Sequence, residues 1–477
     1  MRKTSEVAIQ QQQQQQKMSL KRKSMLAQNP ANDIDGRIVP APKEPRTNGS
    51  AANFKKPLIR VREQWHCPMS RMAQCTSNPI RKIVDQMKLT PNPEKKMIAL
   101  SIGDPTIFGN LSPPEQLLDL VDKRLRNGKC NGYAPSVGYE PARTAVAKYS
   151  VCEGYQNLEA KDVILTSGCS SALDLCISVL ANPGDNILIP RPGFSIYRTL
   201  AESLGIEARS YNLLADRQWE VDLAHLEESI DDRTAAIVVN NPSNPCGSVY
   251  TREHLRAIAH IAERYKVPII ADEIYAHFVF PGHEFHWFAS VNPNVPVLSC
   301  GGLTKRWLVP GWRQGWIVIY DAKGHFAEVR KGLLALSTRI LGPNTVCQAA
   351  IPDILEFTPP EFYASTLKCI EENAKLSYAK LSAVPGLRPV MPEGAMYMMV
   401  GFSQSEYPDF PDEMAFTERL VTEQSVFCLP SRCFEIGMFF RIVLTVPSDM
   451  MTEACDRIAQ FCAAHHRPTG SAGNGSV

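Results

Sequence analysis

The residues with the clearest chemical potential lie in one segment, SCGGLTKRWLVPGWRQGW, which spans residues 299–316. Lys305 follows a run of small residues at the end of an apolar stretch, and Arg313 stands eight residues later between glycine-containing pairs. A partly desolvated lysine amine can bond covalently to a carbonyl carbon, and a fixed arginine can donate two hydrogen bonds to a phosphate or a carboxylate. Taken singly, the two residues are explained as well by a surface lysine and by the cation of a core ion pair.

Another segment, LTSGCSSALDL, indicates a phosphate site. It predicts a strand that stops at Ser167 and Gly168, followed by a helix that begins at Cys169 and Ser170. The free backbone N–H groups at the start of a helix bind phosphate. A serine cap after a glycine turn produces the same pattern, so this segment alone leaves both interpretations open.

Two more apolar runs end in residues that could bind a ring. ADEIY places Asp272 at the end of a predicted buried strand, where a carboxylate needs a cation or strong donors. NNPSNPCG supplies Asn240, Asn241 and Asn244 in a turn with two prolines. A core salt bridge and an ordinary rigid turn are the structural alternatives for these two segments.

Together, these segments contain the parts that pyridoxal 5′-phosphate requires. A lysine bonds to its aldehyde, an aspartate pairs with its ring nitrogen, and a helix N-terminus and an arginine hold its phosphate. An aspartate about 4 Å from the ring nitrogen stabilises the protonated ring by up to ~4 kcal/mol at an effective dielectric of about 20, or roughly three pKa units. A ring kept protonated at neutral pH accepts electrons from the substrate Cα, so the sequence predicts this cofactor.

The elements that must position these residues alternate along the chain. Apolar runs predict strands at residues 161–167, 185–194, 234–247, 267–275 and 295–303, with helical periodicity between them at 170–180 and 199–205. Strands buried on both faces have such continuous apolar sequences. The polar residues fall at the carboxyl ends of these strands, where ligands bind in open α/β sheets. The pattern therefore predicts an α/β fold with a mostly parallel sheet.

Composition predicts how the chain is divided. Residues 1–72 include the glutamine run Gln10–Gln16, and 13 Lys and Arg against 5 Asp and Glu up to residue 66, so we expect a disordered basic arm. Residues 106–360 are predicted to form the large domain and residues 361–465 a smaller α+β domain, from a long charged helix near 366–384 and strands near 395–400, 425–430 and 440–446. We expect residues 73–105 to return to the small domain and residues 466–477 to form a flexible tail.

Composition also excludes several classes of protein. Hydrophobic residues make up 44% of the chain and charged residues 21%, as in ordinary globular proteins. Without a nucleic-acid-binding motif or a run of about 18 apolar residues, neither nucleic acid nor a membrane is an expected partner. The 14 cysteines form no Cys-x-x-Cys pair, so we expect reduced thiols, no metal site and a cytoplasmic protein. The basic arm, almost free of acids before Asp33, leaves a mitochondrial location as the alternative.

The order of the motifs resembles that of the fold-type I, class I and II aminotransferases, which use pyridoxal 5′-phosphate. NPSNP, ADEIY, the glycine-rich turn before Lys305 and PGWRQGW follow one another in the family's order. The similarity continues through LSIGDPTIFGN, NGYAPSVGY, IPRPGFSIY, RILGP, PEGAMYMMVG and FFRIVLTVP, from about residue 75 to 465. The resemblance implies a large domain with a mostly parallel sheet of the seven-stranded type, a smaller α+β domain, and a homodimer.

The resemblance also implies roles for the residues that match. Lys305 would bond to the cofactor and, once released, carry the proton between the substrate Cα and the cofactor. Asp272 would hold the ring nitrogen, Asn244 and Tyr275 would bind the ring oxygen, and Phe194 would stack on the ring. The implied phosphate contacts are Gly168, Cys169, Ser170 and Arg313, with Tyr133 reaching the phosphate in a neighbouring subunit.

For the substrate, the resemblance implies that Arg441, in FFRIVLT, binds the α-carboxylate. Asn244 would share this site, and Gly103 would lie behind the contact. One position departs from the family: Gly302 stands where many members have a serine. A hydroxyl contact to the phosphate is lost there, so Gly302 is left out of the predicted binding set.

The longest matches are to members that transfer the amino group of L-tyrosine to 2-oxoglutarate. This implies a ping-pong reaction giving 4-hydroxyphenylpyruvate and L-glutamate, in the catabolism of tyrosine and phenylalanine. The nearest alternatives are transamination of kynurenine or alanine, and β-lyase action on cysteine conjugates, because no segment indicates which side chains select the substrate. A non-catalytic scaffold that binds pyridoxal phosphate is the alternative of another class, and the intact Lys305, Asp272, Arg313 and Arg441 argue against it.

Overall fold

The computed structural model describes residue 65 and residues 67–468. Most of the predicted basic arm and most of the predicted tail lie outside the described residues. The chain separates into two units, Met1–Cys67 and Pro68–Val477, and the elements below all belong to the second. The boundaries predicted for the arm, the two domains and the tail stay predictions.

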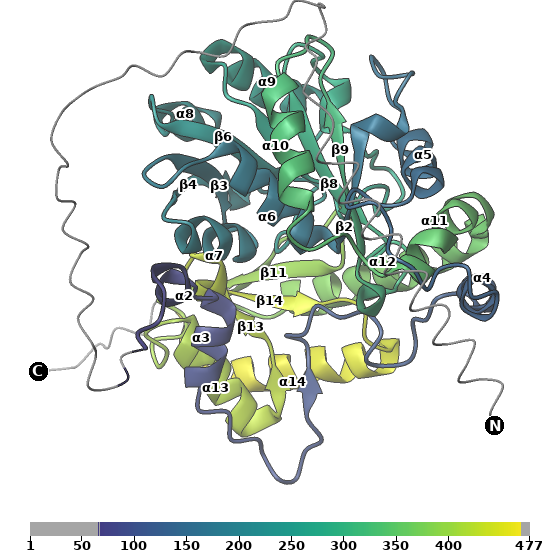
Figure 1. Cartoon of the computed structure of the whole chain (residues 1–477). Helices are drawn as coiled ribbons and strands as arrows, with labels where there is room; N and C mark the ends of the chain where they lie inside the picture. The colour runs from purple at the N-terminus through teal and green to yellow at the C-terminus, as the bar shows by residue number, and fades with distance from the viewer. Residues whose placement is uncertain (1–64, 66, 469–477) are drawn as a thin grey trace, which may run out of the picture. The chain divides into compact units, whose positions relative to one another are not determined.

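A sheet of eight strands forms the centre of this unit (Figure 1). Its spatial order is β2 (Val163–Ser167), β9 (Gln314–Tyr320), β8 (Val297–Gly302), β7 (Ile269–Asp272), β6 (Thr234–Asn240), β3 (Asn186–Arg191), β4 (Glu207–Leu214) and β5 (Glu220–Val221). The five strands from β8 to β4 pair in parallel, whereas β9 is antiparallel to both its neighbours and β5 is antiparallel to β4. The predicted mostly parallel sheet is therefore confirmed.

Alternate residues of the central strands bury in two separate cores, one on each face of the sheet. In β7, for example, Ile269 and Ala271 enter one core and Ile270 enters the other. The first core is covered by α5 (Glu140–Tyr149), α9 (Arg252–Tyr265) and α11 (Thr345–Phe357). The second is covered by α6 (Cys169–Leu180), α7 (Ile196–Ser203) and α10 (Ala327–Ser337). Burial on both faces explains why these strands have continuous apolar sequences.

The sheet has one strand more than the predicted seven-stranded type, because the two residues of β5 pair with the edge strand β4. The sequence analysis also did not identify β4 or β9 as strands. In β9 the apolar run begins only after Gly315, and a Cβ at Gly315 would lie 2.4 Å from the carbonyl carbon of Gly168. Only glycine lets β9 pass this close to the end of β2.

The C-terminal part of the chain forms a four-stranded antiparallel sheet, ordered β10 (Leu387–Pro389), β11 (Tyr397–Phe402), β14 (Phe439–Val443) and β13 (Leu429–Pro430). The helices α12 (Pro360–Ser382), α13 (Glu413–Gln424) and α14 (Ser448–His465) pack with it in a third core. Ahead of the large sheet in the sequence, β1 (Ile98–Ala99) pairs in parallel with β12 (Val426–Phe427). A segment near residue 100 thus lies beside the C-terminal elements.

The remaining helices are short or lie at the periphery. They are α2 (Arg71–Cys75), α3 (Pro79–Gln86), α4 (Glu115–Arg126) and α8 (Leu223–Glu228). Helix α2 starts within the last two residues of the predicted arm. Over the described part of the chain, no helix combines the length and the apolar character needed to cross a membrane.

Candidate active site

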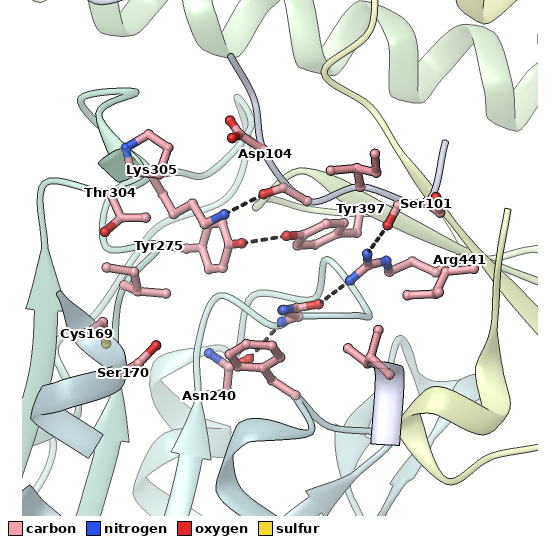
Figure 2. A pocket seen from close by; sticks show the side chains of 18 of the residues that line it. Ser101, Asp104, Cys169, Ser170, Asn240, Tyr275, Thr304, Lys305, Tyr397 and Arg441 are labelled. Carbon is pink, nitrogen blue, oxygen red and sulfur yellow. Dashed lines mark hydrogen bonds between the residues drawn. The ribbon is translucent and has the colours of Figure 1, made fainter. Parts of the chain in front are cut away.

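A cavity of about 650 Å³ opens at the carboxyl ends of β6, β7 and β8 (Figure 2). Its wall is completed by side chains from α3, from the segment after β1, and from β11 and β14. The cavity brings together ten of the twelve residues predicted for the site: Gly103, Cys169, Ser170, Phe194, Asn244, Asp272, Tyr275, Lys305, Arg313 and Arg441. These residues come from segments that are far apart in the sequence, and the parallel strand ends unite most of them.

One end of the cavity is formed by the start of α6. Cys169 and Ser170 line it, and Gly168, at φ +78°, precedes the helix. Arg313 adopts a left-handed φ of +54° and donates from Nη2 to the Ser167 carbonyl over 3.1 Å. A Cβ at Gly168 would lie 2.5 Å from Arg313 Nη2. Gly168 is not among the residues that line the cavity, and its lack of a side chain lets the guanidinium lie against the helix start.

Asp272 is the buried acid of the site, with 2% of its surface exposed. The Tyr197 hydroxyl donates to its Oδ2 over 2.6 Å, and the Cys169 thiol lies 3.6 Å from its Oδ1. Burial raises the pKa of Asp272, which these donors and the Lys305 charge only partly offset. Within the described chain it has no salt-bridge partner, so a cation placed in the cavity would be strongly favoured beside it.

Lys305 projects into the cavity from the turn after β8 (Figure 2). Its Nζ donates to the Gly103 carbonyl over 2.7 Å and lies 5.8 Å from the centre of the Tyr275 ring. The neighbouring Gly302 is enclosed, because a Cβ there would lie 2.6 Å from the Gln314 carbonyl oxygen. A serine at this position would force a backbone shift, which accounts for the glycine.

Asparagines at the end of β6 and in the turn after it connect Asp272 to Arg441. Asn240 Nδ2 donates to the Asp272 carbonyl over 3.0 Å, and its Oδ1 accepts from the Asn244 N–H over 2.8 Å. Asn244 Oδ1 in turn accepts from Arg441 Nη1 over 2.9 Å. Asn240 thus orients the turn, and the Asn244 amide faces the cavity beside the half-buried ring of Phe194.

Arg441, on β14, is a buried cation with 4% of its surface exposed. Its Nη2 donates to the Ser101 carbonyl over 2.9 Å, its guanidinium carbon lies 4.2 Å from the centre of the Tyr397 ring, and its Nε has no partner. Burial lowers the pKa of Arg441. Because none of the described acidic side chains pairs with it, it can accept a carboxylate from a ligand.

Gly103 and Tyr133 have surroundings that bear on their predicted roles. The backbone acceptor behind Arg441 is Ser101, whereas Gly103, two residues further along the segment, contacts Lys305 instead. Tyr133 has 93% of its surface exposed and does not line this cavity. A role for Tyr133 in the cavity of the same chain is therefore excluded, and its predicted role in a neighbouring subunit stays a prediction.

Sequence reasoning missed several residues of the cavity. Tyr397 is fully buried between Lys305 and Arg441, and its hydroxyl accepts from the Tyr275 hydroxyl over 2.9 Å. The short helix α3 contributes Ile80, Arg81 and Val84. No motif marks these positions, because an apolar strand and a short amphipathic helix carry no sign of what they face.

The cavity fits the predicted phosphate-bearing cofactor at each end. A helix start and an arginine lie at one end, a buried acid without a salt-bridge partner lines the same cavity, and the Lys305 amine projects into it. The Arg441 guanidinium supplies a separate place for a carboxylate. Over the described residues, no group of three or more His, Cys, Asp or Glu side chains is arranged to hold a metal ion.

Comparison with known proteins agrees with this geometry. Residues 95–458 match the family model for aminotransferase class I and II. Tyrosine aminotransferase from Mus musculus is 57% identical over 404 residues, covering 84% of this chain and 89% of the mouse protein. Among solved structures, tyrosine aminotransferase from Leishmania infantum matches with a TM-score of 0.82 at 35% identity, covering 85% of this chain and 100% of that one. Alanine aminotransferase from Pyrococcus furiosus matches with a TM-score of 0.77 at 29% identity, covering 83% and 100%.

Proposed function

The chain belongs to the class I and II aminotransferases, and from this premise we propose that it transfers the amino group of L-tyrosine to 2-oxoglutarate. The products are 4-hydroxyphenylpyruvate and L-glutamate, as expected for tyrosine and phenylalanine catabolism. The observation that carries the choice of substrate is the similarity to the mouse tyrosine aminotransferase. Its sequence identity to this chain is 57%, against 29% for the alanine aminotransferase. The sequence-based prediction of the family is confirmed.

We propose pyridoxal 5′-phosphate as the cofactor, on the fit of the cavity. Gly168, Cys169, Ser170 and Arg313 would hold the phosphate, and Asp272 the ring nitrogen. Asn244 and Tyr275 would bind the ring oxygen, and Phe194 would pack on the ring. When bound, the cofactor supplies an electron sink for the bond at the substrate Cα that breaks.

Two side chains of the protein would act on the substrate. Arg441 holds the α-carboxylate through its guanidinium, which the Asn244 and Ser101 oxygens keep in a fixed orientation. Lys305 carries the proton on Nζ after Cα loses it, and the Gly103 carbonyl orients this amine. The apolar side chains Ile80, Val84, Ile102 and Leu429 line the cavity and would exclude water from the aromatic ring of the substrate.

The substrate is tested by initial rates. With 2-oxoglutarate in excess, L-tyrosine should give a kcat/KM at least tenfold above those of kynurenine and L-alanine. Cystathionine should release no ammonia above background, which separates transamination from β-lyase action. A higher kcat/KM for kynurenine or alanine, or ammonia release from cystathionine as the fastest reaction, would contradict the assignment to tyrosine.

We also propose that the protein is a homodimer in which Tyr133 serves the site of the other subunit. In support, Tyr133 is almost fully exposed although the family resemblance gives it a phosphate contact. Sedimentation should give about twice the chain mass of 53.0 kDa. Mixed dimers of Lys305→Ala and Tyr133→Ala subunits should be more active than either variant alone, because one of their two sites lacks both changes. Mixed dimers no more active than the parents would contradict shared sites.

We propose a cytosolic location. All the cysteines among the described residues are free thiols, as expected in a reducing compartment. Cell fractionation of the full chain should recover the activity with cytosolic markers. Recovery with mitochondrial markers would favour the alternative instead.

A further inference from the structure

Tyr397 has a place in the cavity that the assigned roles do not use. Its side chain is buried and its ring lies between the two cations that would act on the substrate, Lys305 and Arg441 (Figure 2). The Arg441 guanidinium carbon stands 4.2 Å from the ring centre, within the range of a cation–π contact. The ring therefore supports the group that would bind the α-carboxylate.

The hydroxyl of Tyr397 faces the other way, toward the lysine. It accepts a hydrogen bond from the Tyr275 hydroxyl over 2.9 Å. A Cβ on Gly103 would lie 2.7 Å from this oxygen, and the Gly103 carbonyl is the acceptor for Lys305 Nζ. The hydroxyl, the Gly103 backbone and the lysine amine thus share one small volume, and only a glycine at position 103 leaves room for them.

The charges around this phenol favour its ionised form. Burial raises the pKa of Tyr397, but the positive charges of Lys305 and Arg441 and the hydrogen bond from Tyr275 outweigh burial and lower it. Burial and the neighbouring Tyr397 raise the pKa of Tyr275. The Tyr397 oxygen is therefore the acceptor of the pair, with partial negative charge toward the lysine amine.

From these contacts we propose that Tyr397 is a positioning residue that couples the two cations of the site. Its hydroxyl holds the proton-carrying form of the Lys305 amine, and its ring holds the Arg441 guanidinium in the plane that receives the carboxylate. The proposal rests on the proposed function, because it assigns Lys305 to proton transfer and Arg441 to substrate binding. The proposal adds Tyr397 as one residue that positions both the Lys305 amine and the Arg441 guanidinium.

Two substitutions separate the two contacts. Tyr397→Phe keeps the ring and removes the hydroxyl, so kcat for L-tyrosine should fall about tenfold while KM stays within about threefold. Tyr397→Leu removes the ring as well and should raise KM by about a further tenfold. An increase in KM with unchanged kcat in Tyr397→Phe would overturn the proposal, because the hydroxyl would then act on substrate binding alone.

The deciding measurement reads Lys305 directly, without cofactor or substrate. In the full chain freed of cofactor, trace acetic anhydride is added at one fixed pH, and acetylation of the peptide containing Lys305 is quantified over time by mass spectrometry. Because the hydroxyl would no longer hold the amine, Lys305 should be acetylated about tenfold faster in Tyr397→Phe than in the unchanged protein.

Tyr211→Phe is the matched control. It also removes a buried tyrosine hydroxyl, which donates to the Val238 carbonyl over 2.8 Å in the core, outside the cavity. Its rate of Lys305 acetylation should equal that of the unchanged protein. An acetylation rate in Tyr397→Phe equal to that of Tyr211→Phe would overturn the proposal. A chain inactive on L-tyrosine would contradict the proposed function, whereas the acetylation rate would still decide the role of Tyr397.

Discussion

At the scale of the residue, Asp272 shows most clearly how the site departs from an ordinary protein core. Its carboxylate is buried with hydroxyl and thiol neighbours and, in the described part of the chain, no salt-bridge partner. Burial raises its pKa and the Lys305 charge only partly offsets this, so a cation held closer to the carboxylate would be favoured. The cavity is therefore prepared for a ligand that carries a protonated nitrogen.

Replacing Asp272 by asparagine should remove that preference with little change in shape. At about 4 Å and an effective dielectric of about 20, loss of ~4 kcal/mol corresponds to a fall in kcat/KM of roughly 1,000-fold, with at least about 100-fold expected after desolvation losses. Steady-state kinetics with L-tyrosine measure it. Tyr197→Phe, which leaves the carboxylate and removes its donor, should lower kcat/KM by no more than about tenfold. Equal losses in the two variants would contradict the charge argument.

The site residues that sequence reasoning identified share one property. Lys305, Asp272 and Asn244 are polar side chains that follow apolar strands, so their position in the sequence already reveals the edge of the sheet. Tyr397 and α3 could not be identified in this way, because their role depends on contacts with other segments of the chain, such as that between the hydroxyls of Tyr397 and Tyr275. The Ser101 carbonyl accepts from Arg441 and the Gly103 carbonyl accepts from Lys305, and this pairing likewise depends on tertiary geometry alone.

At the scale of the element, the junction between β2 and α6 controls the predicted phosphate end. Gly168 stands at φ +78° and Arg313 lies where its Cβ would be. Gly315 allows β9 to pass against the same junction. Three segments therefore meet at a point where side chains are excluded, which is what a phosphate cradle made of backbone N–H groups requires.

Gly168→Ala should weaken binding of pyridoxal 5′-phosphate, because the new Cβ displaces the Arg313 guanidinium. We expect the dissociation constant to rise about tenfold or more, measured by absorbance titration of cofactor-free protein. Gly184→Ala is the matched control, since Gly184 also has a positive φ, of +96°, but a Cβ there meets nothing within 4 Å. If Gly168→Ala binds the cofactor as tightly as Gly184→Ala does, displacement of Arg313 does not weaken binding and the expectation is contradicted.

The elements themselves were predictable to different extents. The strands β6, β7 and β8 were predicted because burial on both faces makes them continuously apolar. Strand β4, with the sequence EARSYNLL, pairs next to the edge and alternates polar with apolar residues, and it was missed. The start of β9 was not predicted, because Arg313, Gln314 and Gly315 interrupt the apolar pattern there. The sequence thus predicts the strands with continuous apolar runs, the edge strand β2 among them, better than it predicts β4 and β9.

At the scale of the whole molecule, a titrating acid outside the cavity lies buried in the core. Glu273, adjacent to Asp272, accepts from the Phe288 N–H over 2.8 Å and from the Ser299 hydroxyl, and burial raises its pKa to about 7. The folded protein therefore binds a proton that the unfolded chain releases near its ordinary pKa of 4.5. The contribution of Glu273 to the free energy of unfolding should fall as pH rises from about 4.5 to about 7, by about 3 kcal/mol in total.

Glu273→Gln should remove this dependence, because the amide is neutral at every pH. The thermal midpoint of the variant relative to the unchanged protein should therefore be higher at pH 8 than at pH 5. The exposed Glu328, replaced in the same way, should leave the difference between the two pH values unchanged. A Glu273→Gln midpoint that keeps the same offset at both pH values would show that Glu273 is already ionised in the folded protein at pH 5.

The central claim is that Lys305 binds pyridoxal 5′-phosphate in this cavity and that L-tyrosine transfers its amino group to the bound cofactor. The most direct test is an absorbance spectrum of the purified protein and of Lys305→Ala, recorded before and after adding L-tyrosine without an oxo acid. We predict a visible band in the unchanged protein that L-tyrosine replaces by an ultraviolet one, 2-oxoglutarate then restoring it, with no such cycle in the variant. A protein that shows no visible band with added cofactor, or whose band L-tyrosine leaves unchanged, would contradict the account.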